Sequence, residues 1–267
     1  MISIHQALKQ AYTKDPTHKE YILFILCELL QKDKAWIFLN PDFQIDEKIF
    51  FDYVDKFLHG EPFEYLFQKT QFYGLDFFVE KGVLIPRFDS EVLLEKCLEI
   101  LEHHTFKNIL EIGFGSGILS ICLAKLKKNH IHACDINKKA LELAKKNADF
   151  HGVSNKIDFQ LCDFKNIQGN FDFIFSNPPY IKNDYPLDKW VQNEPHNALF
   201  GGDNGWEILH EIILFAKNQN AKVLACEFGY DQKTILQKLL EENGFKASFY
   251  KDYSGFDRAF VAWNLKY

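Results

Sequence analysis

The sequence predicts an α/β protein in which a doubly wound, mostly parallel sheet follows a small helical bundle. From residue 108 onward, short apolar runs rich in β-branched and aromatic residues alternate with segments of helical periodicity. Several of these runs are apolar at every position, as is typical of strands covered by helices on both faces of a parallel sheet. Residues 1–70, by contrast, have helical periodicity throughout. We therefore predict a helical domain (1–70), a β-hairpin linker (71–85) and an α/β domain (86–267).

The N-terminal part contains no glycine-rich loop and no cluster of titratable groups, so we expect it to position a partner and not to perform chemistry. Its first helix has Ile4, Leu8 and Tyr12 on one face. The other predicted helices of this part are Pro16–Gln31, Lys34–Leu39, Asp46–His59 and Phe63–Phe67. Glycine-containing turns at Gly74 and at Lys81-Gly82, flanked by apolar residues, then predict the hairpin.

The α/β part is predicted to open with a helix over Glu91–His103, capped at its N-terminus by Ser90 or Asp89. The last two strands are separated by a short turn, which makes one of them antiparallel. The predicted strands are Asn108–Ile112, His130–Asp135, Lys156–Cys162, Phe171–Ser176, Lys222–Glu227, Lys246–Lys251 and Arg258–Trp263, and the helices between them are Ile118–Lys128, Lys138–His151, Gly205–Asn218 and Asp231–Glu242.

Composition excludes several classes of protein. A net charge of −6 and a pI near 5.9 argue against a broad nucleic-acid-binding surface, which needs a basic face. The six cysteines are scattered without a Cys-x-x-Cys pair, so we interpret them as reduced thiols of a cytoplasmic protein. No histidine or cysteine spacing indicates a metal site. The apolar run Tyr21–Leu30 contains Glu28 and is too short to span a bilayer, so we expect a core helix and no membrane segment.

The motif Asn177-Pro178-Pro179-Tyr180 follows the predicted strand Phe171–Ser176 and ends it abruptly. Neither proline can donate a ladder hydrogen bond, so the chain leaves the sheet as a stiff, extended corner at the carboxyl edge, where ligands bind in open α/β sheets. The Asn177 side-chain oxygen and the Pro178 carbonyl are two acceptors that match the two hydrogens of a planar NH2 group. Tyr180 offers a flat face on which that group can stack. Taken alone, the motif is better explained as a rigid turn after a core strand, and only the other motifs below favour a binding role.

A second motif, Gly113-Phe114-Gly115-Ser116-Gly117, lies at the turn between the first strand and its helix. Glycines allow a ligand to lie against the backbone there. Asp135 ends the next strand, where a carboxylate can accept hydrogen bonds from ribose hydroxyls, although helix capping is an alternative role. Asp163 and Phe164 end the third strand, where an acid and a ring can bind the edge and face of an adenine.

These strand ends together predict the cofactor. The glycine spacing departs from the Gly-x-Gly-x-x-Gly pattern with which dinucleotide-binding proteins hold a pyrophosphate. An adenosine without phosphate, carrying an electrophilic methyl group beside the Asn177 corner, fits better, and this description is that of S-adenosylmethionine.

Arginine use is a further pointer. Of 31 basic residues, only Arg87 and Arg258 are arginines, so these two mark places where a planar, bidentate guanidinium is needed. Arg87 is predicted either to contact the cofactor or to pair with Asp89 or Glu91. For Arg258 we expect an ion pair at the sheet edge.

Almost the whole chain resembles the bacterial HemK/PrmC family of methyltransferases. The similar segments, besides the motifs above, are Gly60-Glu61-Pro62, Ile85–Glu91, Glu194-Pro195, Ala198–Gly202, Glu227–Gln232 and Gly255–Arg258. The chain departs from the family pattern at four positions, with Phe88 in place of proline, Ser90 and Phe114 in place of threonine, and Glu111 in place of aspartate.

The resemblance implies a seven-stranded, Rossmann-like S-adenosylmethionine-dependent methyltransferase domain preceded by the helical bundle. It implies methyl transfer to the side-chain amide nitrogen (N5) of the glutamine in the Gly-Gly-Gln motif of peptide chain release factors, which are the protein partners. By that resemblance Asn177, Pro178 and Tyr180 are catalytic, the whole Asn177–Tyr180 motif binds substrate, and the cofactor contacts come from Arg87, Gly113, Phe114, Gly115, Ser116, Gly117, Asp135, Asp163, Phe164 and Asn177.

Enzymes that act on other substrates share the Asn-Pro-Pro-Tyr motif, so the motif alone does not decide the substrate. A ribosomal-protein glutamine methyltransferase is one alternative. A DNA or RNA amino-methyltransferase, which presents a flipped base to the same corner, is another. A cofactor-binding module without catalysis is a third, which the intact motif disfavours. The absence of a basic recognition domain and the acidic pI favour a protein substrate.

Overall fold

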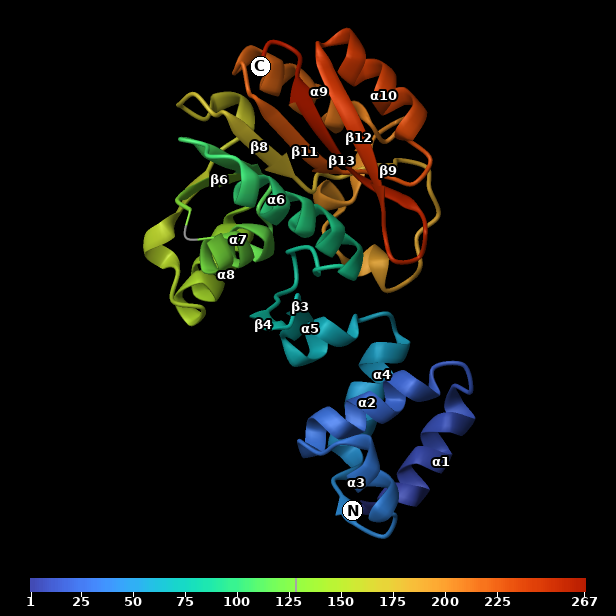
Figure 1. Ribbon diagram of the computed structural model, residues 1–267. Coiled ribbons are helices and arrows are strands. Elements are labelled where there is room, and N and C mark those ends of the chain that lie inside the picture. The colour runs from blue at the N-terminus through green and yellow to red at the C-terminus, as the bar shows by residue number, and fades with distance from the viewer. Residues whose placement is uncertain (128) are drawn as a thin grey trace. The chain divides into compact units, whose positions relative to one another are not determined.

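The computed structural model describes residues 1–127 and 129–267, and the chain forms two compact units (Figure 1). The first unit contains residues 1–68 together with residues 187–193, and the second contains residues 69–186 and 194–267. The end of the predicted helix Ile118–Lys128, at Lys128, lies outside the described residues.

The first unit is helical, as predicted, and also has a two-residue antiparallel strand pair that the periodicity did not reveal. Side chains buried inside it include Ile4, Ile22, Ile25, Phe50 and Val54. The elements are β1 (Ile2–Ser3), α1 (Ile4–Lys14), α2 (Lys19–Leu30), α3 (Lys34–Leu39), β2 (Gln44–Ile45), α4 (Glu47–Leu58) and α5 (Phe63–Phe67).

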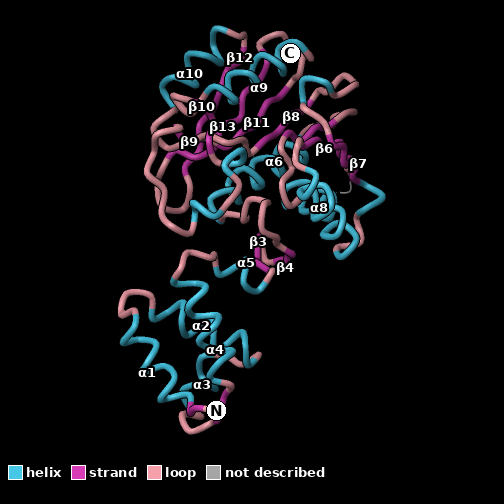
Figure 2. Tube along the Cα trace, turned by 180° about the vertical axis from the view of Figure 1, so that it is seen from behind, coloured by secondary structure: helices cyan, strands magenta, loops and turns pink. Residues whose placement is uncertain are grey.

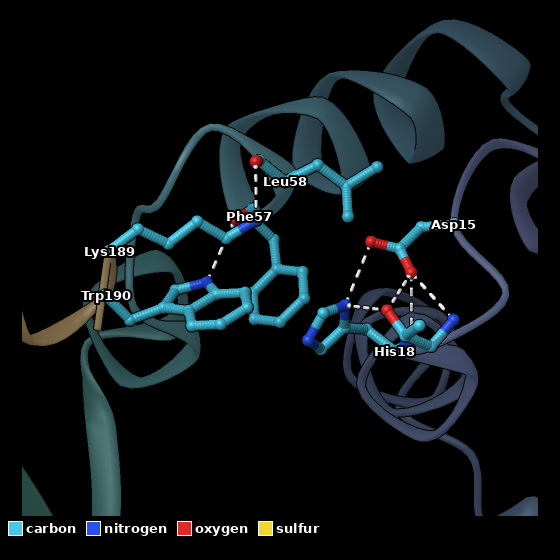
Figure 3. Close-up of polar contacts among 7 residues, drawn as sticks. Asp15, His18, Phe57, Leu58, Lys189 and Trp190 are labelled. Carbon is cyan, nitrogen blue, oxygen red and sulfur yellow. Dashed lines mark hydrogen bonds and ion pairs between the residues drawn. The ribbon is translucent and has the colours of Figure 1, made fainter.

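Residues 187–193 belong to this unit because they bind the C-terminal end of α4. The Trp190 indole N–H donates to the Phe57 carbonyl at 3.0 Å, and the Lys189 ammonium donates to the Leu58 carbonyl at 3.1 Å (Figure 3). Carbonyls at the end of a helix have no partner within the helix, so this segment satisfies two of them. The Asn193 amide adds a bond to the Gly60 carbonyl at 2.8 Å.

The second unit is a seven-stranded sheet between two layers of helices (Figure 2). The strand order is β12-β13-β11-β8-β5-β6-β7, in which β13 is antiparallel to both β11 and β12, as the predicted terminal hairpin requires. The strands of this sheet are β5 (Ile109–Ile112), β6 (Ile131–Asp135), β7 (Ile157–Leu161), β8 (Phe173–Ser176), β11 (Val223–Glu227), β12 (Phe245–Lys251) and β13 (Asp257–Asn264).

The two faces of the sheet are covered by different helices. One face packs with α6 (Glu91–His103), α7 (Ile118–Lys127) and α8 (Lys138–Phe150). The other packs with α9 (Glu207–Asn218) and α10 (Lys233–Glu242). Alternate residues of β8 serve the two cores: Phe173 and Phe175 face the first layer, and Ile174 faces the second, which explains why the strand is apolar at every position.

The predicted hairpin is shorter and earlier than residues 71–85. It consists of β3 (Lys69–Phe72) and β4 (Leu75–Phe78), which turn at Gly74, and the segment around Lys81-Gly82 forms no strand. The hairpin packs on α8, where the buried Asn147 side chain bonds to the backbone N–H and carbonyl of Phe78. A short parallel pair, β9 (Ile181–Lys182) with β10 (Phe200–Gly202), was not predicted.

Candidate functional site

Strand register brings the ends of five parallel-running strands to one edge of the sheet. Ile112 of β5 pairs with Cys134 of β6 and with Ser176 of β8, and Ser176 also pairs with Cys226 of β11. The residues that come next in the chain therefore stand in a row: Gly113, Asp135, Asn177 and Glu227. The order of the strands reverses between β5 and β8, and ligands of open α/β sheets bind at such a switch point.

A pocket of about 260 Å³ opens at this edge. Most of the predicted site residues line it, namely Gly113, Gly115, Asp135, Asp163, Phe164, Asn177, Pro178 and Pro179. A smaller hollow of about 40 Å³ shares Gly113, Gly115 and Asn177 with the pocket and adds Arg87, Phe114 and Ser116. The two hollows thus bring together predicted site residues that are up to 92 positions apart in the sequence, from Arg87 to Pro179.

Two of the predicted residues lie outside both linings. Gly117 faces α8, where an added Cβ would lie 3.1 Å from Ala144, so this glycine allows close helix packing. Tyr180 is partly buried, and its hydroxyl donates to Glu227 at 2.9 Å. Burial beside that carboxylate raises the pKa of Tyr180. Phe114 is buried with its ring against Phe159, so only part of it borders the smaller hollow.

The glycine loop presents open backbone to the pocket. Gly113 and Gly115 have φ angles of +73° and +53°, and a Cβ on either would meet no atom within 4 Å. The N–H of Gly115 donates to Asp135 Oδ2 at 2.9 Å, and the N–H of Asn137 donates to Asp135 Oδ1 at 2.8 Å. Burial raises the pKa of Asp135, while these two bonds act in the opposite direction. The Asn137 side chain, and not Asp135, caps α8.

This chemistry fits an adenosine carrying a positive sulfonium better than a pyrophosphate. The loop N–H of Gly115 that a phosphate would use is already bonded to Asp135. Two further acids, Asp163 and Glu211, line the pocket, and the basic side chain among the described lining residues, Lys165, pairs with Glu211 at 2.8 Å. An acidic pocket repels phosphate and attracts a cation. The Phe164 ring, held edge-on by Phe215 at 5.4 Å, supplies an apolar wall.

The corner at Asn177 is held from several sides. The Ser176 hydroxyl donates to the Ile112 carbonyl at 2.7 Å, and the Gln232 amide donates to the Tyr180 carbonyl at 2.8 Å. Gly201 of β10 lies so close that an added Cβ would be 2.5 Å from the Pro179 carbonyl. Glycine is required there by the approach of two backbones. The corner is therefore a fixed feature of the sheet edge.

Both arginines form ion pairs: the partner of Arg87 differs from those predicted, and the ion pair expected for Arg258, for which no partner was predicted, is present. Arg87 pairs with the buried Glu194, whose other oxygen accepts the N–H of Ile85 at 3.0 Å, and not with Asp89 or Glu91. Arg258 lies on β13, which is an inner strand, so the predicted sheet-edge position is wrong. Its guanidinium contacts Asp252 at 3.0 Å and Asp89 at 3.4 Å.

Sequence reasoning missed two polar residues of this site, Ser90 and Glu227. The predicted capping role of Ser90 is wrong, since its side chain makes no cap bond to α6 and its hydroxyl donates to Glu227 Oε2 at 2.6 Å. Burial raises the pKa of Glu227, while bonds from Ser90 and Tyr180 lower it. A signal did exist, because Glu227 is the charged end of an otherwise apolar strand.

Two further properties of the described residues bear on function. No helix within residues 1–127 and 129–267 has the length and apolar character to cross a membrane. Over the same residues, no group of three or more histidine, cysteine, aspartate and glutamate side chains is placed to hold a metal ion.

Comparison with solved structures supports the fold. The human METTL16 catalytic domain, solved in complex with an RNA hairpin, superposes with a TM-score of 0.61 at 20% identity over 72% of this chain and 76% of that one. A ribosomal protein L11 methylase from Lactobacillus delbrueckii subsp. bulgaricus gives a TM-score of 0.52 at 20% identity over 70% and 83% of the two chains. The predicted seven-stranded methyltransferase fold is confirmed.

Sequence comparison is more specific. Residues 3–67 match the PrmC N-terminal domain, and residues 88–193 match the methyltransferase small domain. The chain is 33% identical to the release factor glutamine methyltransferase of Clostridium acetobutylicum, over 98% of this chain and 96% of that protein. It is 36% identical to the enzyme of the same name from Aquifex aeolicus, over 89% and 88%. The chain therefore belongs to the release factor glutamine methyltransferases, which are S-adenosylmethionine-dependent enzymes.

Proposed function

We propose that this protein transfers the methyl group of S-adenosylmethionine to the N5 amide nitrogen of the glutamine in the Gly-Gly-Gln motif of peptide chain release factors. The observation that carries the proposal is the position of the Asn177 corner on the wall of the acidic pocket, next to the glycine loop. The site proposed to bind the substrate NH2 group is thereby next to the site proposed to hold the transferable methyl. Family membership supports release factors as the partner.

Asn177 and Pro178 are proposed to bind the two hydrogens of the substrate amide. The Asn177 side-chain oxygen accepts one hydrogen and the Pro178 carbonyl accepts the other, so that the nitrogen lone pair is directed into the pocket. When bound, S-adenosylmethionine supplies an electrophilic methyl on a sulfonium. Tyr180 packs beside the amide plane, while its hydroxyl stays bonded to Glu227.

Orientation and exclusion of water supply most of the rate acceleration in this proposal. An amide nitrogen is a weak nucleophile because its lone pair is delocalised, so an enzyme gains by holding the group in a reactive geometry. Well-oriented reactants can gain about 7–11 kcal/mol in this way. The contacts that hold the corner, from Gln232, Ser176 and the close approach of Gly201, serve this purpose.

We also propose roles for the remaining predicted site residues and for the helical part. Asp135 is proposed to bind the ribose, and Asp163 and Phe164 the adenine. Gly113, Phe114, Gly115 and Ser116 are proposed to form the loop against the cofactor, while Gly117 allows the close packing on α8 that holds this loop. Arg87 borders the smaller hollow on the cofactor side. The helical unit, residues 1–68 with 187–193, is proposed as a docking domain for the release factor, and the second unit, which includes the β3–β4 hairpin, as the catalytic domain. We also propose a cytoplasmic location and no nucleic-acid substrate.

The experiment is a methyl-transfer assay with labelled S-adenosylmethionine. The acceptors are a release factor, its variant with the Gly-Gly-Gln glutamine changed to alanine, a ribosomal protein fraction and DNA. Label in the release factor that disappears in the alanine variant is the expected result. Label in ribosomal protein or in DNA, with none in the release factor, would replace the proposed substrate by that acceptor.

A further inference from the structure

A chain of hydrogen bonds connects Asn177 to a buried carboxylate on the neighbouring strand. Glu227 ends β11 and is 1% exposed. Its Oε2 accepts from the Ser90 hydroxyl at 2.6 Å, and its Oε1 accepts from the Tyr180 hydroxyl at 2.9 Å. Ser90, which is fully buried, in turn accepts a hydrogen bond from Asn177 Nδ2 at 2.9 Å.

The direction of these bonds follows from counting protons. A carboxylate can only accept, so the single hydroxyl proton of Ser90 is committed to Glu227. The Ser90 oxygen can then only accept on its other side. The group of Asn177 that faces it must therefore be the NH2, and Oδ1 is the atom that stays available to accept a hydrogen bond. The carboxylate thus decides which way round the Asn177 amide lies.

The local backbone leaves the Ser90 hydroxyl available for this chain of bonds. Ser90 is the last residue of a 3-10 turn, Phe88–Ser90, and its backbone angles (φ −68°, ψ −12°) are helical, whereas a capping serine has an extended backbone. Its side chain makes no cap bond to α6 and bonds instead to a residue 137 positions away.

The surroundings of Glu227 act on its ionisation in opposite directions, and burial, the largest influence, raises its pKa above the ordinary value. Arg258 of β13 and Asp89, which precedes α6, are the charged groups that act on it together with Tyr180. Arg258 and Asp89 are themselves paired at 3.4 Å. Two hydroxyl donors and a nearby guanidinium therefore favour the carboxylate, against the cost of its burial.

We propose that Ser90 and Glu227 are positioning residues that lock the Asn177 amide with its oxygen toward the glutamine NH2 of the substrate. The inference rests on the function proposed above. Without the Ser90 oxygen, the Asn177 amide can rotate by half a turn and present its own NH2 to the substrate NH2. In that orientation the hydrogen-bond donors of Asn177 face the hydrogen-bond donors of the substrate amide. Asn177 then cannot bind the glutamine NH2 group that receives the methyl.

The test compares Ser90→Ala with Ser90→Thr and with a matched control, Ser120→Ala. Ser120 is also fully buried and also donates its hydroxyl to a buried carboxylate, that of Glu111. Ser90→Ala is expected to lower kcat about tenfold, the equivalent of one hydrogen bond, with the Kd of S-adenosylmethionine unchanged within about twofold. Ser90→Thr restores kcat, and Ser120→Ala lowers thermal stability but leaves kcat near the wild-type value.

A double substitution separates positioning from general damage to the fold. Because Ser90 acts through Asn177, adding Ser90→Ala to an Asn177→Ala protein should change the residual kcat by less than about twofold. A second readout needs no substrate: in protein with 15N-labelled asparagine, the Nδ2 hydrogen of Asn177 that bonds to Ser90 should exchange slowly with water in the wild type and fast in Ser90→Ala.

Three results would each overturn the positioning role and leave the proposed function in place. They are a wild-type kcat in Ser90→Ala, an equal loss of kcat from Ser90→Ala in the wild-type and Asn177→Ala proteins, and failure of Ser90→Thr to restore activity. A wild-type protein that leaves the release factor unlabelled would remove the proposed function, and this role of Ser90 with it.

Discussion

The indole of Trp190 stacks on the ring of Phe57, with their centroids 5.1 Å apart and their planes 27° apart, and its N–H donates to the Phe57 carbonyl (Figure 3). The His18 ring meets the same indole edge-on at 4.8 Å. Trp190 comes ten positions after Tyr180 in sequence, yet it packs in the helical unit. One short segment of the chain that carries the substrate corner therefore completes the helical bundle.

Trp190→Ala should destabilise the helical unit by about 2 kcal/mol, from the lost ring stacking and one lost hydrogen bond. Trp190→Phe is the matched control, because it keeps a ring and removes only the indole N–H, and about half of the loss is expected. Urea unfolding measures the free energy, and hydrogen exchange locates it. Exchange should rise in α4 and stay unchanged in β5 and β8. Unchanged exchange in α4 would show that the segment contributes nothing to the bundle.

The segment 187–193 shows which features of the fold could not be predicted from the sequence. Helices such as Lys34–Leu39 and Phe63–Phe67 were predicted with their observed bounds, because periodicity and end signals are local. Residues 187–193 carry no regular pattern, and their assignment to the helical unit depends on contacts with residues about 130 positions earlier. The short strand pairs β1–β2 and β9–β10 were not predicted either, because two or three residues give too little periodicity.

Gly201→Ala should displace the Asn177 corner. An added Cβ would lie 2.3 Å from the Gly205 carbonyl and 2.5 Å from that of Pro179, distances that require backbone movement. Because a misplacement of about 1 Å can reduce a rate about 100-fold, we expect kcat to fall at least about tenfold. Steady-state kinetics with saturating cofactor and release factor measure this.

Gly244→Ala is the control for the cost of replacing a glycine. Gly244 has a φ of +83° with open space around it, so alanine there strains the backbone without meeting a neighbour. This variant should lose stability but keep its kcat. If both alanine variants lost activity in proportion to their stability, close packing of Gly201 on the corner would have no specific role.

The polar partners of the site were also beyond local reasoning. The strand ends predicted which residues gather at the pocket, because parallel strands share one carboxyl edge. They did not predict that Ser90 would bond to Glu227, 137 positions away, or that Arg87 would select Glu194, 107 positions away. At both places a nearer partner was available in sequence, and the fold overrode it. Such departures from local preference are typical of functional sites.

Asp135→Ala should weaken S-adenosylmethionine binding about tenfold or more, with a smaller effect on kcat at saturation. The substitution removes the proposed ribose acceptor and also leaves the N–H groups of Gly115 and Asn137 without their carboxylate. Isothermal titration calorimetry gives the Kd. Asp158→Ala is the control, since Asp158 lies on neighbouring β7, outside both linings, beside His132. Equal affinity in the Asp135 variant and the wild type would remove Asp135 from the cofactor site.

Asn177→Ala should reduce kcat by much more than it weakens cofactor binding. The substitution removes the proposed acceptor for one substrate hydrogen, whereas the glycine loop, Asp135 and Phe164 that line the pocket remain. Comparing kcat with the calorimetric Kd for S-adenosylmethionine separates the two effects. Equal losses in both quantities would contradict the assigned role.

Glu111, in the middle of the strand that leads to the glycine loop, should make the stability of the protein depend on pH. It is 1% exposed, and burial raises its pKa to about 8, although Ser120 donates two hydrogen bonds to it. Between its ordinary pKa of 4.5 and about 8, the folded protein holds a proton that the unfolded chain has released. Stability from this group is therefore complete below 4.5 and is lost as the pH rises toward 8, with a slope of up to about 1.4 kcal/mol per pH unit.

Glu111→Gln removes this titration while its amide oxygen can still accept both bonds from Ser120. The variant should gain stability relative to the wild type as the pH rises from 5 to about 8, and the difference should then level off. Because Asp135 and Glu227 titrate in both proteins, the difference between the two unfolding curves isolates Glu111. Urea unfolding at several pH values measures it, and a difference that does not change with pH would mean that Glu111 is already ionised in the folded protein at pH 5.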